Sequence, residues 1–340
     1  MAWRARARGL SVLVLERGEL GAATSRVAAG MLAPVAEADA GERALLALGL
    51  QSAERWPAFA AQLGEVSGVD LDFRACGTLM VARDRDEAEA LERERALRER
   101  MGLRVGRLLP TAARRLEPAL APTLRGALHL PDDHVVDPRL VCAALVRAAQ
   151  DAGAVLRAGV EIDELAALPA EQVVVAAGPW SGAFGEEARV RPVKGQSLRL
   201  RDPAGPGLVE RVVRWEGGYL APRGDGRYVL GATSEERGFD TAVTAGALHE
   251  LLRDASELVP GVLELEIEEL LAGLRPGTPD NAPIIGRSLI DPRIVWATGH
   301  YRNGVLLAPV TADLVVSELA GEPVEHAFSP GRFVHEGAPA

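Results

Sequence analysis

The sequence predicts an α/β protein in which a domain of parallel strands and helices is interrupted by a second domain with an antiparallel sheet. Residues 10–15 (LSVLVL) and 172–178 (QVVVAAG) are almost wholly apolar, as expected of parallel strands that are buried on both faces. Three consecutive runs after the second of these, over 194–201, 217–223 and 226–233, predict antiparallel strands. An apolar strand followed by a helix then returns near the end of the chain.

The remaining elements follow from helical periodicity and from glycine or proline at their ends. In chain order we expect a helix over 2–8, a Gly/Ala/Ser segment over 21–30, a helix over 44–63, a strand over 77–84, a charged helix over 85–102, a helix that starts after Asp137 and Pro138 and ends at Gly153, a helix over 245–258, strands over 263–270 and 293–300, and a helix over 305–320. The charged helix carries Glu89/Arg93 and Glu94/Arg98 at i,i+4 spacing, and we expect its charges to be solvated.

Residues 2–16 have the order helix, glycine, strand and acidic residue, which is the second half of a β-α-β unit. On this pattern we divide the chain into a discontinuous α/β domain and an inserted domain. The α/β domain comprises residues 1–65, 126–189 and 271–335, and the inserted domain comprises residues 66–125 and 190–270.

Composition excludes some classes of partner. The formal net charge of −10 at pH 7 argues against nucleic acid and anionic membranes, because both bind basic surfaces. Cys76 and Cys142 have no C-x-x-C spacing, so we expect two reduced, buried thiols. The apolar core near the start is shorter than the ~7–15 residues of a signal peptide, and no run approaches the ~18 apolar residues of a membrane span. We therefore expect a cytoplasmic protein.

Three stretches have features of a nucleotide site. Glu16 ends the first strand, where an acidic side chain binds ribose hydroxyls in dinucleotide folds; the alternative is a solvated carboxylate. Residues 22–34 (AATSRVAAGMLAP) are small and include Thr24 and Ser25, so their backbone can approach a large flat ligand; the alternative is a flexible loop. Gly178 follows an apolar strand, where α/β sheets bind ligands, although an ordinary strand-to-turn transition has the same pattern.

Arg275 and Arg302 are candidates for binding an anion. Each lies among apolar or small residues, in AGLRPGTPDNAPIIGR (272–287) and ATGHYRNGVLLAP (297–309). A guanidinium in such surroundings needs an anionic partner, and its planar fork fits a carboxylate with two hydrogen bonds. The alternative for each arginine is an internal salt bridge.

The residues around Arg302 add one electrostatic feature. Asn303 and Gly304 lead into the helix expected from Val305, whose N-terminus favours negative charge. His300 is close by, but no histidine spacing indicates a metal site, and no G-x-S-x-G or Cys/His pattern indicates nucleophilic catalysis. We therefore expect no metal and no covalent nucleophile.

Together these stretches resemble the FAD-dependent D-amino-acid oxidase family. The resemblance is carried by GLSVLVLERGELGAATSRVAAGMLAP (9–34), VVVAAGPWSG (173–182), GGYLAPRGDGRYVLGAT (217–233) and, most specifically, LLAGLRPGTPDNAPIIGR (270–287) with TGHYRNGVLLAP (298–309). Within the family it is strongest to the members that oxidise glycine for thiamine biosynthesis. It implies a Rossmann-like FAD-binding domain and a substrate domain that contains the antiparallel sheet.

The resemblance also implies a role for each matching residue. Arg275 and Tyr219 would hold the substrate carboxylate, and Arg302 would lie at both substrate and flavin, so that Tyr219 and Arg302 are the implied catalytic residues. The implied FAD-binding residues are Glu16, Arg17, Thr24, Ser25, Ala29, Gly30, Met31, Gly178, His300, Tyr301, Arg302, Asn303, Gly304, Val305 and Leu306.

The implied reaction is the oxidation of glycine to its imine, with release of glyoxylate and ammonia and reduction of molecular oxygen to hydrogen peroxide. Such a reaction depends more on residues that hold the substrate in a fixed orientation than on a general base. The alternatives are sarcosine or a small D-amino acid as substrate, a dehydrogenase with another electron acceptor, and a flavin-free remnant that acts as a binding protein. Association into a homo-oligomer stays open.

The chain departs from the family pattern at its start. Family members begin with a strand and a G-x-G-x-x-G turn whose amides hold the pyrophosphate, whereas Met1, Ala2 and Trp3 already fall in the helix that follows that turn. We therefore expect this chain to lack the first strand and the glycine turn of the FAD-binding domain.

We accordingly predict that the 340-residue chain binds FAD weakly and that an upstream-extended chain binds it tightly, because only the extended chain would supply the phosphate-binding amides. The visible absorption spectra of the two purified proteins measure their flavin content. Equal flavin content would contradict the prediction.

Overall fold

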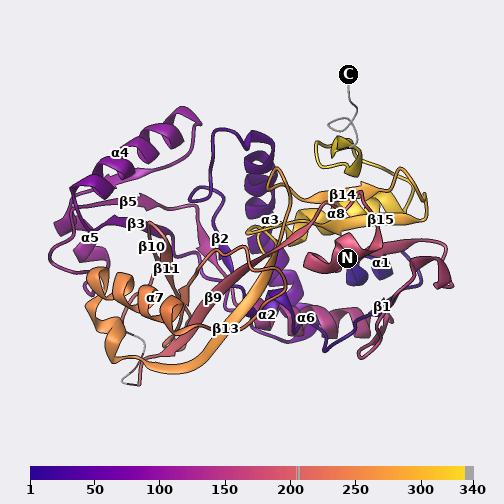
Figure 1. The fold of residues 1–340 in the computed structure, drawn as a ribbon, viewed down its shortest axis with the longest axis horizontal. Coiled ribbons are helices and arrows are strands. Elements are labelled where there is room, and N and C mark those ends of the chain that lie inside the picture. The colour runs from indigo at the N-terminus through magenta and orange to yellow at the C-terminus, as the bar shows by residue number, and fades with distance from the viewer. Residues whose placement is uncertain (204, 206, 334–340) are drawn as a thin grey trace.

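The computed structural model describes residues 1–203, 205 and 207–333, and these form an elongated α/β molecule (Figure 1). One end holds a large sheet with α4, α5 and α7 around it, and the other end holds α1, α8 and the strands β1, β14 and β15. The long helix α3 and the long strands β9 and β13 lie between the two ends. The α/β class and the antiparallel strands expected from the sequence are confirmed.

The helices of the described residues are α1 (Ala2–Ala7), α2 (Thr24–Val27), α3 (Arg43–Ser67), α4 (Arg85–Arg100), α5 (Pro110–Leu116), α6 (Pro138–Asp151), α7 (Ala245–Leu258) and α8 (Ala308–Leu319). Short 3-10 turns lie at Leu165–Ala167, Gly178–Phe184, Pro260–Glu264 and Pro330–Phe333. The α6 helix begins as the sequence predicts, since the Asp137 side chain accepts a hydrogen bond from the Arg139 amide and Pro138 occupies the first turn.

The large sheet has the strand order β13-β9-β12-β11-β10-β3-β5-β4. Its strands are β3 (Thr78–Ala82), β4 (Gly106–Leu108), β5 (Gly126–Leu130), β9 (Arg191–Arg201), β10 (Val212–Trp215), β11 (Gly218–Pro222), β12 (Arg227–Gly231) and β13 (Glu266–Gly277). Neighbouring strands are antiparallel except for β10 and β3. The β9–β13 pair runs from Arg201 opposite Glu266 to Arg191 opposite Gly277, and so carries the sheet from one end of the molecule towards the other.

Outside the large sheet, parallel pairing occurs in two separate units of the described residues. One unit pairs β1 (Leu13–Leu15) with β7 (Val155–Arg157). The other places β15 (Ile294–Thr298) between β8 (Val173–Val175), which is parallel to it, and β14 (Ile284–Arg287), which is antiparallel. A further pair joins β2 (Met31–Leu32) to β6 (His134–Val135).

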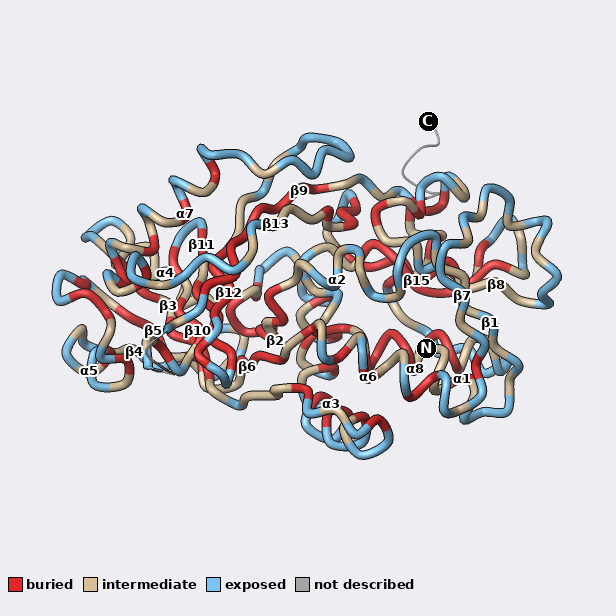
Figure 2. The backbone as a smooth tube through the Cα atoms, turned by 90° about the horizontal axis from the view of Figure 1, so that it is seen from below, coloured by how far each residue is buried: buried red, intermediate tan, exposed pale blue. Residues whose placement is uncertain are grey.

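Two main apolar cores hold these units together. Around Trp56 and Leu63, helices α3, α6 and α8 pack against β15, whereas α7 packs through Leu251 against the large sheet around Leu200 and Tyr228. The buried backbone in Figure 2 lies accordingly both along the large sheet and along α6, α8 and β15. None of the helices in the described ranges has the length and apolar character that a membrane crossing requires.

The structure corrects two element predictions. The last helix begins at Ala308 and not at Val305, because residues 303–307 form a turn in which the Leu307 amide bonds to the Asn303 carbonyl, 2.8 Å away. Pro309 then lies in the first helical turn, where its missing N–H is tolerated. Strand β10, a short apolar run that contains Arg214, was not among the predicted elements.

Two stretches inside the predicted bounds of the α/β domain belong to the large sheet. Residues 126–130 (β5) and 271–277 (the end of β13) both hydrogen bond within it. The physical reason is that β13 continues its antiparallel pairing with β9 without interruption past residue 270. The division into two domains itself stays a prediction.

Residues 33–37 form a buried, irregular segment that two charged side chains hold in place. The Asp133 carboxylate accepts hydrogen bonds from the Val35 and Ala36 amides, at 2.9 and 2.8 Å. Arg98 donates from Nε and Nη2 to the carbonyls of the same two residues, at 2.9 and 2.8 Å. The amide and carbonyl groups of both residues therefore have hydrogen-bond partners although the segment is neither sheet nor helix.

Arg98 also corrects the prediction that the charged helix shows only a solvated face. Its side chain is 1% exposed, although it keeps the expected ion pair with Glu94. Glu89 pairs with Arg85 at 2.9 Å rather than with Arg93. Helical spacing located the Glu94–Arg98 pair, but only the tertiary structure brings residues 35 and 36 next to Arg98.

Asp133 predicts a pH dependence of stability. Burial raises its pKa to about 7 despite the two amide donors, so the folded protein holds this proton more tightly than the unfolded chain, whose aspartates titrate near about 3.9. Stability from this group is fully present below about pH 4 and is lost as pH rises through 7. Between pH 5 and 7 this group should lower the free energy of unfolding of the wild type by at most about 1.4 kcal/mol per pH unit. We expect Asp133→Asn to lack this pH-dependent decrease.

Urea unfolding of both proteins at several pH values measures this slope. Asp132→Asn is the matched control, because Arg104 holds the pKa of Asp132 below its usual range and this carboxyl does not titrate between pH 5 and 7. Identical slopes for the wild type and Asp133→Asn would contradict the assignment.

Candidate active site

A cavity of about 1110 Å³ lies between the large sheet and two irregular segments, residues 24–31 and 300–305. This volume exceeds the range of about 300–1,000 Å³ that is typical of a site for a single drug-sized ligand, so the cavity has room for a cofactor together with a small substrate. Strands β9, β10, β11 and β13 contribute the polar residues Ser197, Arg214, Tyr219 and Arg275 to its lining.

The cavity brings together most of the residues singled out from the sequence. Those that line it are Thr24, Ser25, Ala29, Gly30, Met31, Gly178, Tyr219, Arg275, His300, Tyr301, Arg302, Asn303, Gly304 and Val305. They come from segments far apart in the chain, which the fold places around one space.

Three of the residues singled out do not line this cavity. The Glu16 carboxylate accepts a hydrogen bond from the Gly18 amide at 2.9 Å, beyond the end of β1. The Arg17 guanidinium lies 3.9 Å from the ring centre of Trp180. Leu306 is 2% exposed, and its carbonyl accepts hydrogen bonds from Ser52 and Trp56, so it holds the 300–307 turn from the core side.

Arg275 is a partly buried arginine that faces the cavity without an acidic partner. Its Nη1 donates to the carbonyls of Thr233 at 3.1 Å and Lys194 at 3.4 Å, and no carboxylate of the described residues lies within 4 Å. Burial lowers its pKa. The side chain lies across Gly195 on the neighbouring strand, where a Cβ would be 2.5 Å from the guanidinium nitrogens. A small anion in the cavity would supply the missing partner.

Tyr219 lies across a second glycine of the same sheet. It stands opposite Gly231, where a Cβ would be 2.6 Å from the phenol oxygen. Burial raises the pKa of Tyr219, so the phenol keeps its proton and can donate a hydrogen bond. Ser197 pairs with Gly231 from the other side, on β9, and lines the cavity. Its buried hydroxyl has no hydrogen-bond partner among the described residues.

Glu37 and Arg214 line the cavity and were missed by the sequence analysis. Arg214 is on β10, opposite Tyr219 of the neighbouring strand β11. It donates a hydrogen bond to one carboxylate oxygen of Glu37 at 2.6 Å, and Arg302 lies 3.9 Å from the other oxygen. Burial alone would raise the pKa of Glu37, but Arg214 and Arg302 outweigh it and hold the pKa low. The signal was present, since Arg214 stands in the apolar run VVRW just as Arg275 stands among apolar residues.

His300 is neutral in this site. Its Nε2 lies 2.9 Å from the Thr311 hydroxyl, and burial lowers its pKa to about 4. The contact with α8 therefore positions the 300–305 segment without adding a charge. The N-terminus of α8 itself lies at Ala308 and not next to Asn303 as expected.

The wall formed by residues 24–31 suits a flat ring with a polar arm. Gly30 has φ of 76° and packs so closely that a Cβ would be 1.9 Å from the Val136 carbonyl, which leaves backbone and small side chains on the cavity side. The Thr24 hydroxyl donates to the Leu274 carbonyl at 2.7 Å, so this segment offers a ligand mainly its amides and the Ser25 hydroxyl. Among the described residues no group of His, Cys, Asp and Glu is arranged to hold a metal ion.

Comparison with known proteins gives this geometry a family. Residues 1–318 match the family model described as FAD dependent oxidoreductase, DAO. The chain is 34% identical over 340 residues to glycine oxidase of Geobacillus kaustophilus, an alignment that spans 95% of this chain and 89% of that protein. It is also 34% identical to the bifunctional protein ThiO/ThiG of a Synechocystis species, where it spans 96% of this chain and 50% of that protein.

The crystal structure of glycine oxidase from Geobacillus kaustophilus superposes with a TM-score of 0.90 at 33% identity, covering 98% of this chain and 93% of the other. Agreement in sequence and fold over almost the whole chain includes both segments that line the cavity. The chain therefore belongs to the DAO family of FAD-dependent oxidoreductases, and FAD is its cofactor.

Proposed function

We propose that this protein oxidises glycine to the imine, which water converts to glyoxylate and ammonia, with molecular oxygen as the final electron acceptor and hydrogen peroxide as the second product. The observation that carries the proposal is Arg275, a cation that faces the cavity without a carboxylate partner among the described residues. An α-amino acid carries a carboxylate, which a planar guanidinium group can bind with two parallel hydrogen bonds. The similar proteins named glycine oxidase support the choice of amino acid.

In this proposal the residues of the chain act by positioning. Arg275 binds the substrate carboxylate, the protonated phenol of Tyr219 donates to the same group, and the Glu37–Arg214 ion pair fixes the wall beside it. Residues 24–31 and 300–305 hold the cofactor ring and its polar arm. Bound FAD accepts the two electrons that leave the substrate α-carbon. The two sides of the cavity thus bring the α-carbon and the ring together.

The described titratable groups of the site do not favour general base catalysis. His300 is neutral, buried and in contact with Thr311, and Glu37 is shared between Arg214 and Arg302. The amine must therefore arrive neutral or lose its proton to water. We further propose that the product serves thiamine biosynthesis, in line with the family resemblance and with the similarity to a ThiO/ThiG protein.

Removing Arg275 tests the carboxylate site. We expect Arg275→Ala to raise the KM for glycine about tenfold or more, since a hydrogen bond to a charged group contributes roughly 1.5–3 kcal/mol. Steady-state peroxide production measures this value. The control is Arg201→Ala on strand β9, whose exposed side chain lies 4.0 Å from Glu268. A KM unchanged from wild type in Arg275→Ala would remove Arg275 from substrate binding.

The glycine beneath Arg275 gives a second test that leaves the guanidinium in the protein. We expect Gly195→Ala to raise the KM for glycine several-fold, because the new Cβ would occupy the position of the guanidinium. Stability should change little, since a flexible side-chain end can move aside. Gly106→Ala in the same sheet, where the nearest atom to a Cβ is 3.9 Å away, should leave KM unchanged. Equal KM values in the two variants would argue against the observed placement of Arg275.

A further inference from the structure

Three arginines lie behind the cavity wall formed by residues 24–31, and we call them the arginine clamp: Arg139, Arg199 and Arg223. They come from three different elements. Arg139 is in the first turn of α6, Arg199 is on β9, and Arg223 directly follows β11. None of them lines the cavity, and the proposed reaction uses none of them directly.

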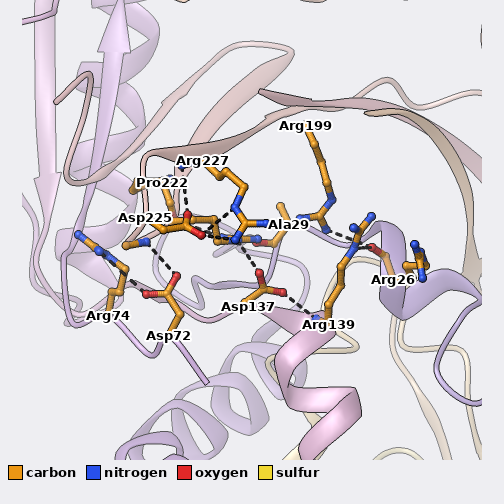
Figure 3. A network of polar contacts seen from close by, with 12 residues as sticks. Arg26, Ala29, Asp72, Arg74, Asp137, Arg139, Arg199, Pro222, Asp225 and Arg227 are labelled. Carbon is orange, nitrogen blue, oxygen red and sulfur yellow. Dashed lines mark hydrogen bonds and ion pairs between the residues drawn. The ribbon is translucent and has the colours of Figure 1, made fainter. Parts of the chain in front are cut away.

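The clamp holds two carbonyl groups of the wall. Arg139 and Arg199 both donate to the Arg26 carbonyl, each at 3.1 Å, and Arg223 donates to the Ala29 carbonyl at 2.6 Å. Figure 3 shows the Arg26 carbonyl between the side chains of Arg139 and Arg199. The Arg26 carbonyl lies near the end of α2, where the unsatisfied carbonyls of a helix favour cations.

These contacts matter because the wall has little regular structure of its own. It contains only the four-residue helix α2 and the start of the two-residue strand β2. Every residue from 24 to 31 except Arg26 lines the cavity, so the carbonyl groups held from behind belong to the same peptide chain that faces a ligand in front. Besides the Val136 amide, which donates to the Gly30 carbonyl, and the β2–β6 pair, side-chain bonds therefore position this wall.

Acidic groups behind the wall fix the clamp in turn. Glu269 of β13 accepts from both terminal nitrogens of Arg139, at 2.6 and 2.9 Å. Asp137, the N-cap of α6, lies 3.3 Å from Nε of Arg223. Arg199 has no acidic partner within 4 Å among the described residues, and its Nε is buried without a hydrogen bond. The contact of its guanidinium that remains is the hydrogen bond from Nη2 to the Arg26 carbonyl.

Arg223 connects the two halves of the site most directly. It stands four residues after Tyr219 along the same strand and turn, and its side chain is 4% exposed. A second donation, to the Pro222 carbonyl at 3.2 Å, holds the guanidinium against the end of β11. The Arg223 guanidinium thus joins strand β11, which carries Tyr219, to the 24–31 wall, which faces the proposed cofactor.

We propose that Arg223, supported by Arg139 and Arg199, is a positioning residue that sets the distance between the substrate strand β11 and the 24–31 wall, and through it the placement of the flavin ring relative to the amino acid. The inference rests on the proposed function for the identity of the substrate, but not for the placement of the ring. Loss of the clamp shifts the wall while Arg275 and Tyr219 stay on their own strands.

The test compares Arg223→Lys and Arg223→Gln with the wild-type chain. Lysine keeps a charge beside Asp137 but cannot reach Asp137, Pro222 and Ala29 together, whereas glutamine also leaves Asp137 without its cation. Arg227→Gln is the matched control, because Arg227 begins the next strand of the same hairpin, is half-exposed and pairs with Asp225.

The first measurements need no substrate. We expect both Arg223 variants to bind FAD about tenfold more weakly or worse, to show a shifted absorption and circular dichroism spectrum of the bound flavin, and to exchange the amide hydrogens of residues 24–32 faster than wild type. The lysine variant should lie between glutamine and wild type. Arg227→Gln should match wild type in all three measurements.

Turnover of glycine supplies the last measurement. We expect kcat to fall about tenfold or more in Arg223→Gln with KM changed less than threefold, since the carboxylate site is intact. Wild-type FAD affinity, flavin spectra and hydrogen exchange in both variants would overturn the proposal even if glycine is oxidised. If glycine is not a substrate but the variants lose flavin and exchange faster, the clamp stands and the proposed substrate fails.

Discussion

The constraint on which this site depends is that buried backbone must have hydrogen-bond partners. Residues 24–37 line or approach the cavity and contain little helix or strand, so few of their amides and carbonyls bond to one another. Charged side chains from the surrounding elements supply the partners. Asp133 and Arg98 hold residues 35 and 36, and the arginine clamp holds residues 26 and 29. The wall is irregular in conformation but fixed in place.

A second consequence concerns charge. Arg214, Arg275 and Arg302 line the cavity together with the carboxylates of Glu37, Glu235, Glu250 and Asp254. Of the described carboxylates, only Glu37 lies within 4 Å of any of these three arginines. The Glu37–Arg214 pair also ties the 33–37 segment to the large sheet, so that both walls share one ion pair. The uncompensated charge is concentrated at Arg275, which is the position where an anionic substrate completes the site. Electrostatics and geometry therefore indicate the same location for the carboxylate.

Two glycines of the large sheet make room for the side chains of the site. Gly195 and Gly231 leave two hollows on one sheet, and the side chains of Arg275 and Tyr219 lie across them. Because neither position carries a Cβ, the two side chains can lie close against the sheet with their polar ends at the cavity. The glycines of the KGQ and LGAT stretches thus shape the site although they carry no functional group.

The sequence alone determined the family resemblance, the α/β class and most of the elements, because apolar periodicity and the glycine and proline positions are local signals. It also singled out Arg275 and Arg302, since an arginine among apolar residues is visible in one dimension. It did not distinguish Arg98, which helical spacing placed on a solvated face, or Arg223 and Asp133, whose partners are far away in the chain. Those roles were decided by the tertiary structure, because burial and the direction of a side chain exist only once distant segments have packed together.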